Sequence, residues 1–187
     1  MKRDSIFYQL FRQSPTLLFE LLPNAPANAR SYRFDSVAVK EPRFEIDGVF
    51  LPPEGSTGPV FFCEVQMQRD EKLCERLFAE AFLYFYQNRD KLHDWQIVFI
   101  YPSRNTEQRN LHPFRGLLAL DQVHRVYLDE LGNVQDLPLS AALAVLTIID
   151  ANQAPAAART LLERAEREAP AETSRAIMDM VVTIISH

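Results

Sequence analysis

Two carboxylates and an amide occupy successive segments of this sequence in a pattern that suits metal chemistry. Asp47 lies in a segment of alternating apolar and polar residues, and Glu64-Val65-Gln66 lies in the next such segment, beyond a turn. Because side chains alternate between the faces of a strand, Glu64 and Gln66 share one face. If the segments pair as neighbouring strands, Asp47 and Glu64 converge at one end of the sheet. Two carboxylates plus a main-chain carbonyl suit Mg²⁺, which leaves its other positions to water and a substrate phosphate.

Hydrophobic periodicity predicts the elements that must position these residues. Apolar residues at spacings of three and four predict a helix around Ile6–Phe11, and Ser14-Pro15 gives the start signal of a short helix over Leu17–Leu22. A long helix is expected from Asp70 to about Asn88. Between them we expect three strands, over residues 32–40, 43–51 and 60–68.

Alternation within the second and third strands predicts which side chains share a face. In the second strand we expect one face to carry Phe44, Ile46 and Phe50, and the other to carry Glu45, Asp47 and Val49. In the third strand we expect one face to carry Phe62, Glu64, Gln66 and Gln68, and the other to carry Phe61, Cys63, Val65 and Met67.

The remaining segments complete an α/β pattern. Trp95–Tyr101 is a continuous apolar run, typical of a strand buried on both faces, and Val123–Leu128 predicts another strand. Helices are expected over residues 139–149, 155–168 and 172–187. The order α-β-β-β-α-β-β followed by helices predicts an α/β fold with a mixed sheet.

Composition bounds the class of protein. The 187 residues predict one domain, or one domain with an appendage, and the 47% hydrophobic content excludes intrinsic disorder. Five glycines leave no Gly-rich phosphate loop. A net charge of −5 argues against coating nucleic acid by charge alone, but not against an enzyme that contacts DNA locally.

The sequence also bears on compartment. Cys63 and Cys74 have neither a zinc spacing nor a disulfide framework, which favours a reducing, intracellular setting. The longest apolar runs, Leu17–Leu22 and Ala141–Ile149, fall short of the roughly 20 residues that a bilayer requires. With no signal-peptide pattern, we expect a cytoplasmic protein without membrane contact.

The motif in this order of elements resembles the PD-(D/E)XK nuclease superfamily. Ile46-Asp47-Gly48 matches its Asp on the second core strand, and Glu64-Val65-Gln66 matches its (D/E)-x-K, with Gln66 in the Lys position. Within the superfamily, the chain is most similar to the recombination-promoting nuclease/putative transposase group and a related family of uncharacterised bacterial proteins. The segments that carry this likeness are Asp4–Tyr8, Phe44–Phe50, Phe62–Gln68, Tyr101–Ser103 and Tyr127–Leu131.

The resemblance implies a restriction-endonuclease-like α-β-β-β-α-β core with a mixed sheet flanked by helices, over residues 1–136, and a C-terminal helical extension over 137–187. It implies an endonuclease that hydrolyses DNA phosphodiester bonds with Mg²⁺ or Mn²⁺, related to transposon or recombination functions. By position, Asp47 and Glu64 would bind the metal, and Gln66 would orient the attacking water or contact the phosphate. Glu20 would be a further acidic ligand.

Several alternatives remain open. Asp47, Glu64, Gln66 and Glu20 could be ordinary solvated polar residues, and Gln66 lacks the positive charge of Lys. Arg76, Tyr84 and Gln87, on the helix after the third strand, are interpreted as surface residues, and so is the basic stretch from Arg104 to Arg125. The main alternative function is a weakly active or inactive nuclease fold that acts as an assembly module. Its C-terminal helices would form a homodimer, because the apolar stripe Ile177–Ile185 must be buried. A third option is a partner protein that binds DNA without cutting it.

Overall fold

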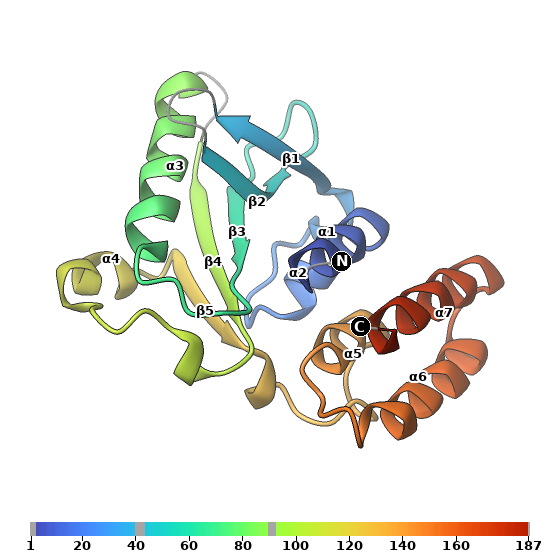
Figure 1. The fold of residues 1–187 in the computed structure, drawn as a ribbon. Coiled ribbons are helices and arrows are strands. Elements are labelled where there is room, and N and C mark those ends of the chain that lie inside the picture. The colour runs from blue at the N-terminus through green and yellow to red at the C-terminus, as the bar shows by residue number, and fades with distance from the viewer. Residues whose placement is uncertain (1–2, 40–43, 90–92, 187) are drawn as a thin grey trace.

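A five-stranded mixed sheet with helices on both faces forms the framework of the protein. The computed structural model describes residues 3–39, 44–89 and 93–186 (Figure 1). The strands are β1 (Arg33–Val39), β2 (Phe44–Leu51), β3 (Val60–Val65), β4 (Trp95–Tyr101) and β5 (Val123–Tyr127). The helices are α1 (Arg3–Gln13), α2 (Leu17–Glu20), α3 (Leu73–Gln87), α4 (Arg115–Leu118), α5 (Leu139–Leu146), α6 (Ala154–Glu168) and α7 (Ala171–Ile185). This confirms the predicted α/β class and element order.

The strands lie in the sheet in their order along the chain. β1 and β3 both pair antiparallel with β2, whereas β4 pairs parallel with β3 and with β5. Because parallel neighbours need a crossover connection, the long helix α3 joins β3 to β4. The third strand ends at Val65, earlier than predicted, but the Gln66 N–H still donates to the Ile100 carbonyl at 2.9 Å.

Each face of the sheet has its own hydrophobic cluster. The α3-side cluster includes Phe62 and Phe99 of the sheet together with Leu77 of the helix. The opposite cluster includes Phe61 and Ile100 together with residues of α1, α2 and the C-terminal helices. Residues 97–101 of β4 are all buried, which confirms the strand predicted to be covered on both faces. The sheet therefore separates two layers, with α3 on one side and α1 and α2 on the other (Figure 1).

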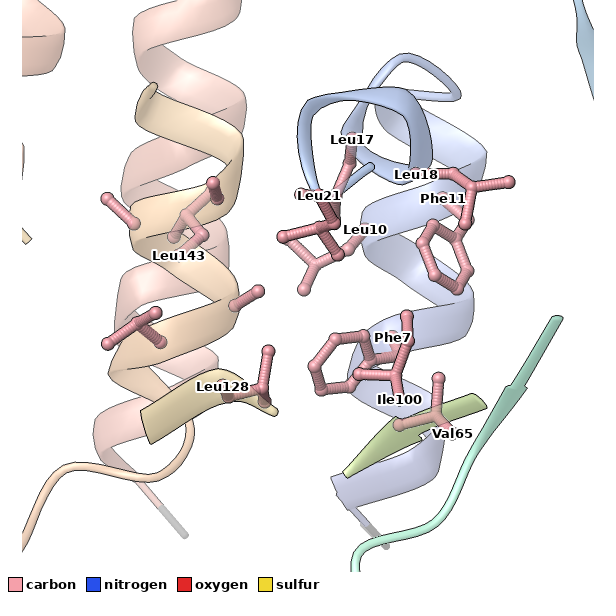
Figure 2. Packing of buried hydrophobic residues seen from close by; sticks show 14 of the residues in the cluster. Phe7, Leu10, Phe11, Leu17, Leu18, Leu21, Val65, Ile100, Leu128 and Leu143 are labelled. Atoms are coloured by element: carbon pink, nitrogen blue, oxygen red, sulfur yellow. The ribbon is translucent and has the colours of Figure 1, made fainter. Parts of the chain in front are cut away.

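The C-terminal helices cover α1 and α2 rather than forming a separate core. Figure 2 shows Leu143 of α5 facing Leu10 and Leu21, while Phe7 of α1 lies over Ile100 and Val65 of the sheet. The predicted boundary at residues 136/137 remains a prediction, but the hydrophobic cluster continues across it. No helix within the described ranges is long and apolar enough to span a bilayer.

The predicted alternation in β2 is wrong, because the strand contains a bulge. Asp35 pairs with Val49 and Val37 pairs with Ile46, so that one β1 residue, Ser36, faces two β2 residues, Asp47 and Gly48. The extra residue reverses the parity of the strand. As a result, Ile46 and Val49 both lie in the α3-side cluster, whereas Phe50 lies in the opposite cluster.

The corresponding prediction for β3 is confirmed over Val60–Val65, where the strand ends. Val60 and Phe62 lie in the α3-side cluster, and Phe61, Cys63 and Val65 lie in the opposite cluster. Glu64 therefore points to the α3 side. Several predicted positions fall outside the description: the strand ends Lys40 and Arg43, the side chains of Phe44 and Glu45, and His187 of the last helix.

The bulge predicts a cost for any side chain at Gly48. A Cβ there would lie 3.1 Å from ring atoms of both Phe34 and Phe50, so Gly48→Val must displace packed rings. We expect a loss of about 1–3 kcal/mol in the free energy of unfolding, measured by urea denaturation. The matched control is Gly116→Val, where a Cβ meets nothing within 4 Å. Equal stability of the two variants would contradict the packing around the bulge.

Candidate functional site

The structure brings Asp47 and Glu64 together. Gly48 pairs with Cys63 across β2 and β3, which sets the two acidic residues side by side on neighbouring strands. The Asp47 N–H donates to Glu64 Oε2 at 3.3 Å, and the Val65 N–H donates to Asp47 Oδ2 at 3.3 Å. Each carboxylate thus accepts a hydrogen bond from the backbone of the other's strand, so the sheet itself fixes the pair.

Glu64 is a buried carboxylate held by one cation. Glu64 is only 3% exposed, and Nη1 of Arg76, in α3, lies 2.7 Å from Glu64 Oε1. Burial and the neighbouring charge of Asp47 raise the pKa of Glu64 to about 8, although Arg76 acts in the opposite direction. Arg76 is the charge partner of a buried carboxylate, and removal of such a partner is strongly destabilising. Arg76 therefore belongs to this site and is not a free surface residue.

Arg76 is the centre of an acidic cluster. Besides Glu64, its guanidinium contacts Asp70 Oδ2 at 3.4 Å and Glu80 Oε1 at 3.9 Å. Burial disfavours the charged guanidinium, but Glu64, Glu80 and Asp70 together raise the pKa of Arg76. With Asp47 close to Glu64, the site gathers four carboxyl groups around a single positive charge. The site therefore has an excess of negative charge that a cation or protons must balance.

Glu80 is the member of this cluster that sequence reasoning missed. It is 0% exposed, and neither of its carboxyl oxygens has a hydrogen-bond partner. Burial and the charge of Asp47 raise the pKa of Glu80 to about 7, against the effect of Arg76. The signal was present, because Glu80 falls between Leu77 and Tyr84 on the buried stripe of α3. A carboxylate at a core position of a helix is rare unless it is paired.

The other two predicted residues have partners of their own. The Gln66 side-chain amide donates to the main-chain carbonyl of Gln68, just beyond the end of β3. Glu20 accepts a hydrogen bond from the Thr16 hydroxyl at 3.3 Å and lies near the backbone of Ala141 in α5. Since α2 packs on the face opposite α3, the structure does not bring Glu20 to Asp47 and Glu64.

The two converging carboxylates have the donor chemistry that Mg²⁺ or Mn²⁺ prefers. Asp47 and Glu64 both offer carboxylate oxygen atoms on neighbouring strands, and both oxygens of the nearby Glu80 lack a hydrogen-bond donor. In the described ranges, no group of three or more His, Cys, Asp or Glu side chains is arranged to hold a metal ion. Asp47 and Glu64 are therefore the two residues that would hold such an ion.

The basic stretch from Arg104 to Arg125 is largely neutralised. Three of its arginines form ion pairs: Arg104 with Glu130, Arg109 with Glu71, and Arg125 with Glu107. The fourth, Arg115, donates to the His112 carbonyl, so the stretch is largely an ion-paired surface, as the simpler interpretation predicted.

The raised pKa values predict that stability falls with rising pH. Folded Glu80 and Glu64 keep their protons to about pH 7 and 8, whereas an unfolded chain releases them near pH 4–5. The folded state therefore binds more protons, and the free energy of unfolding decreases from pH 5 to pH 8. Glu80→Gln should remove about 2 kcal/mol of that decrease. Urea denaturation at several pH values measures it, with exposed Glu75→Gln on the same helix as control; identical slopes for both variants would contradict it.

The comparisons with known proteins place the chain in a family. No curated protein and no solved structure matches it. A family model described as "Protein of unknown function (DUF2887)" matches residues 3–187. Since the match covers nearly the whole chain, this protein belongs to the DUF2887 family.

Proposed function

We propose that this protein is a metal-dependent DNA endonuclease of the PD-(D/E)XK type. The observation that carries the proposal is the convergence of Asp47 and Glu64 across β2 and β3: Glu64 accepts the Asp47 N–H, and Asp47 accepts the Val65 N–H. Two carboxylates held by a sheet, beside a half-buried guanidinium, are suited to hold a divalent cation and a phosphate at one place.

The architecture supports this proposal. The chain runs through α1, then β1, β2 and β3, then α3 and β4, which is the element order that the resemblance implies for a restriction-endonuclease-like core. The two acidic residues stand on the second and third strands of the sheet. The placement of the motif on two neighbouring strands supports the proposal more than the motif alone does.

Three residues of the site would have distinct roles in the proposed reaction. Asp47 and Glu64 would hold Mg²⁺ or Mn²⁺, and the bulge at Asp47–Gly48 sets the direction of the Asp47 side chain. A bound ion of this kind lowers the pKa of a coordinated water and neutralises charge on a phosphate. Gln66 offers a neutral amide at the end of β3, which can orient a water molecule but cannot supply charge.

An acidic protein with these features would contact DNA only locally. The net charge is −5, and the arginines of the stretch from Arg104 to Arg125 are largely ion-paired. Affinity for the phosphate backbone would therefore depend on the bound cation. We infer a reducing cytoplasmic setting and a role related to transposon or recombination functions; both cysteines are free and buried, which agrees with such a setting.

A plasmid nicking assay tests the proposed function. We expect the protein to nick DNA with Mg²⁺ or Mn²⁺, and EDTA to abolish the cleavage. Asp47→Asn should lower the rate by about a hundredfold or more, the scale seen when one electrostatic contact to a transition state is lost. The matched control is Asp121→Asn in an exposed turn before β5, which should cleave like the native protein. Absence of cleavage by folded protein on supercoiled, linear and single-stranded DNA would refute the proposal.

The second candidate function, an assembly module, has a narrower basis than the sequence suggested. Ile177, Met180 and Val181 of the predicted stripe are buried against the chain's own helices, so they need no partner. Ile185 of the predicted stripe is exposed, however, and it lines up on α7 with the exposed Met178 and Val182. These three residues recur at helical spacing, as in a helix that packs on a second copy.

Light scattering tests this assembly role. If α7 forms a homodimer, Val182→Glu should convert it to a monomer, because Val182 is 58% exposed in the single chain and would be buried at the interface. Thr173→Glu, nine residues earlier and on the other side of α7, is the matched control. A native protein of monomeric mass would contradict the assembly role.

A further inference from the structure

Arg76 binds a carboxylate that the proposed function assigns to a cation, that of Glu64. Its Nη1 lies 2.7 Å from Glu64 Oε1, the distance of a charge-assisted hydrogen bond. The guanidinium and a divalent cation would therefore compete for the same carboxylate. Binding of the cation requires Arg76 to move away from Glu64, and a buried or half-buried guanidinium that moves needs another anion to receive it.

Glu80 has the properties of that receiving anion. Its Oε1 lies 3.9 Å from the same Arg76 Nη1, one helical turn along α3. The Glu80 side chain is 0% exposed, and both of its oxygens lack a hydrogen-bond donor. A movement of about 1 Å would bring Nη1 within charge-assisted hydrogen-bond distance of Glu80.

Asp70 supplies the pivot for such a movement. Asp70 Oδ2 lies 3.4 Å from Arg76 Nη2, the second terminal nitrogen of the guanidinium. Asp70 is itself fixed, since its Oδ1 accepts the Lys72 N–H at 2.9 Å. One nitrogen can therefore stay with Asp70 while the other exchanges Glu64 for Glu80.

We propose that Arg76 is a mobile internal counterion, which holds Glu64 when no divalent cation is bound and transfers to Glu80 when one binds. This inference rests on the proposed function, because that function assigns Glu64 to the cation. Glu80 is then a positioning residue that acts through Arg76. A direct ligand role fits less well, because no group of three acidic, His or Cys side chains among the described residues is arranged around one ion.

The consequence is a specific pattern of cation affinities. Loss of Glu80 leaves Arg76 beside the cation, so Glu80→Gln should weaken Mn²⁺ binding by about ten- to hundredfold, the range for residues that orient metal ligands. Loss of Arg76 removes the competitor, so Arg76→Met should bind Mn²⁺ more tightly than the native protein. In the double variant, the Glu80→Gln change should alter affinity by no more than about twofold, because its effect passes through Arg76.

Isothermal titration calorimetry with Mn²⁺ measures these affinities on the full chain. Glu75→Gln is the matched control, because Glu75 lies on the same helix but is exposed and contacts Gln108. Circular dichroism confirms folding, and Arg76→Gln replaces Arg76→Met if the latter does not fold. Without cation, Glu80→Gln should melt no lower than the native protein, since it replaces a buried carboxyl group whose oxygens both lack a hydrogen-bond donor. A residue with only a structural role would lower both Tm and affinity.

Each outcome decides the inference independently of nuclease activity. Unchanged Mn²⁺ affinity in Glu80→Gln would overturn the inference. An equal loss of affinity on Glu80→Gln in the presence and in the absence of Arg76 would also overturn it, because that result would show that Glu80 binds the cation directly. Failure of the native protein to bind Mn²⁺ would overturn both this inference and the proposed function. Mn²⁺ binding with the predicted pattern but no DNA cleavage would support the exchange and refute the nuclease.

Discussion

The site depends on a buried carboxylate that needs a compensating charge. Glu64 stands inside the layer between the sheet and α3, where an isolated ionised carboxylate is very costly. Arg76 supplies that charge from α3, at 2.7 Å from Glu64 Oε1. The same helix adds Glu80, so that the compensation is incomplete. Because the charges are not fully balanced, the cluster is better suited to a functional role than to stabilising the fold.

The strand irregularity serves the same site. The bulge places two residues, Asp47 and Gly48, opposite Ser36, and the two have different tasks. Asp47 directs a carboxylate to the Val65 N–H and the neighbourhood of Glu64. Gly48 gives the rings of Phe34 and Phe50 room to pack on the other face. The acidic pair and the aromatic core are thus built by adjacent residues of one strand, and bulges of this kind commonly redirect side chains near functional sites.

The two faces of the sheet have different roles in the molecule. The face under α3 carries the acidic cluster, while the opposite face packs on α1 and α2, which the C-terminal helices cover in turn (Figure 1). The C-terminal helices therefore support the site only indirectly, through α1, α2 and the sheet. This division explains why the predicted ligand Glu20, which belongs to the opposite layer, does not reach Asp47 and Glu64.

The sequence by itself determined the element order, the parity of β3 and the acidic pair, because each depends on local periodicity and short spacing. Only the tertiary structure decided the rest. The bulge depends on the register between β1 and β2, which alternation in one strand cannot reveal. Arg76 and Glu80 became part of the site because α3 packs with that face toward Glu64, and the pairing of charges distant in sequence is a property of packing.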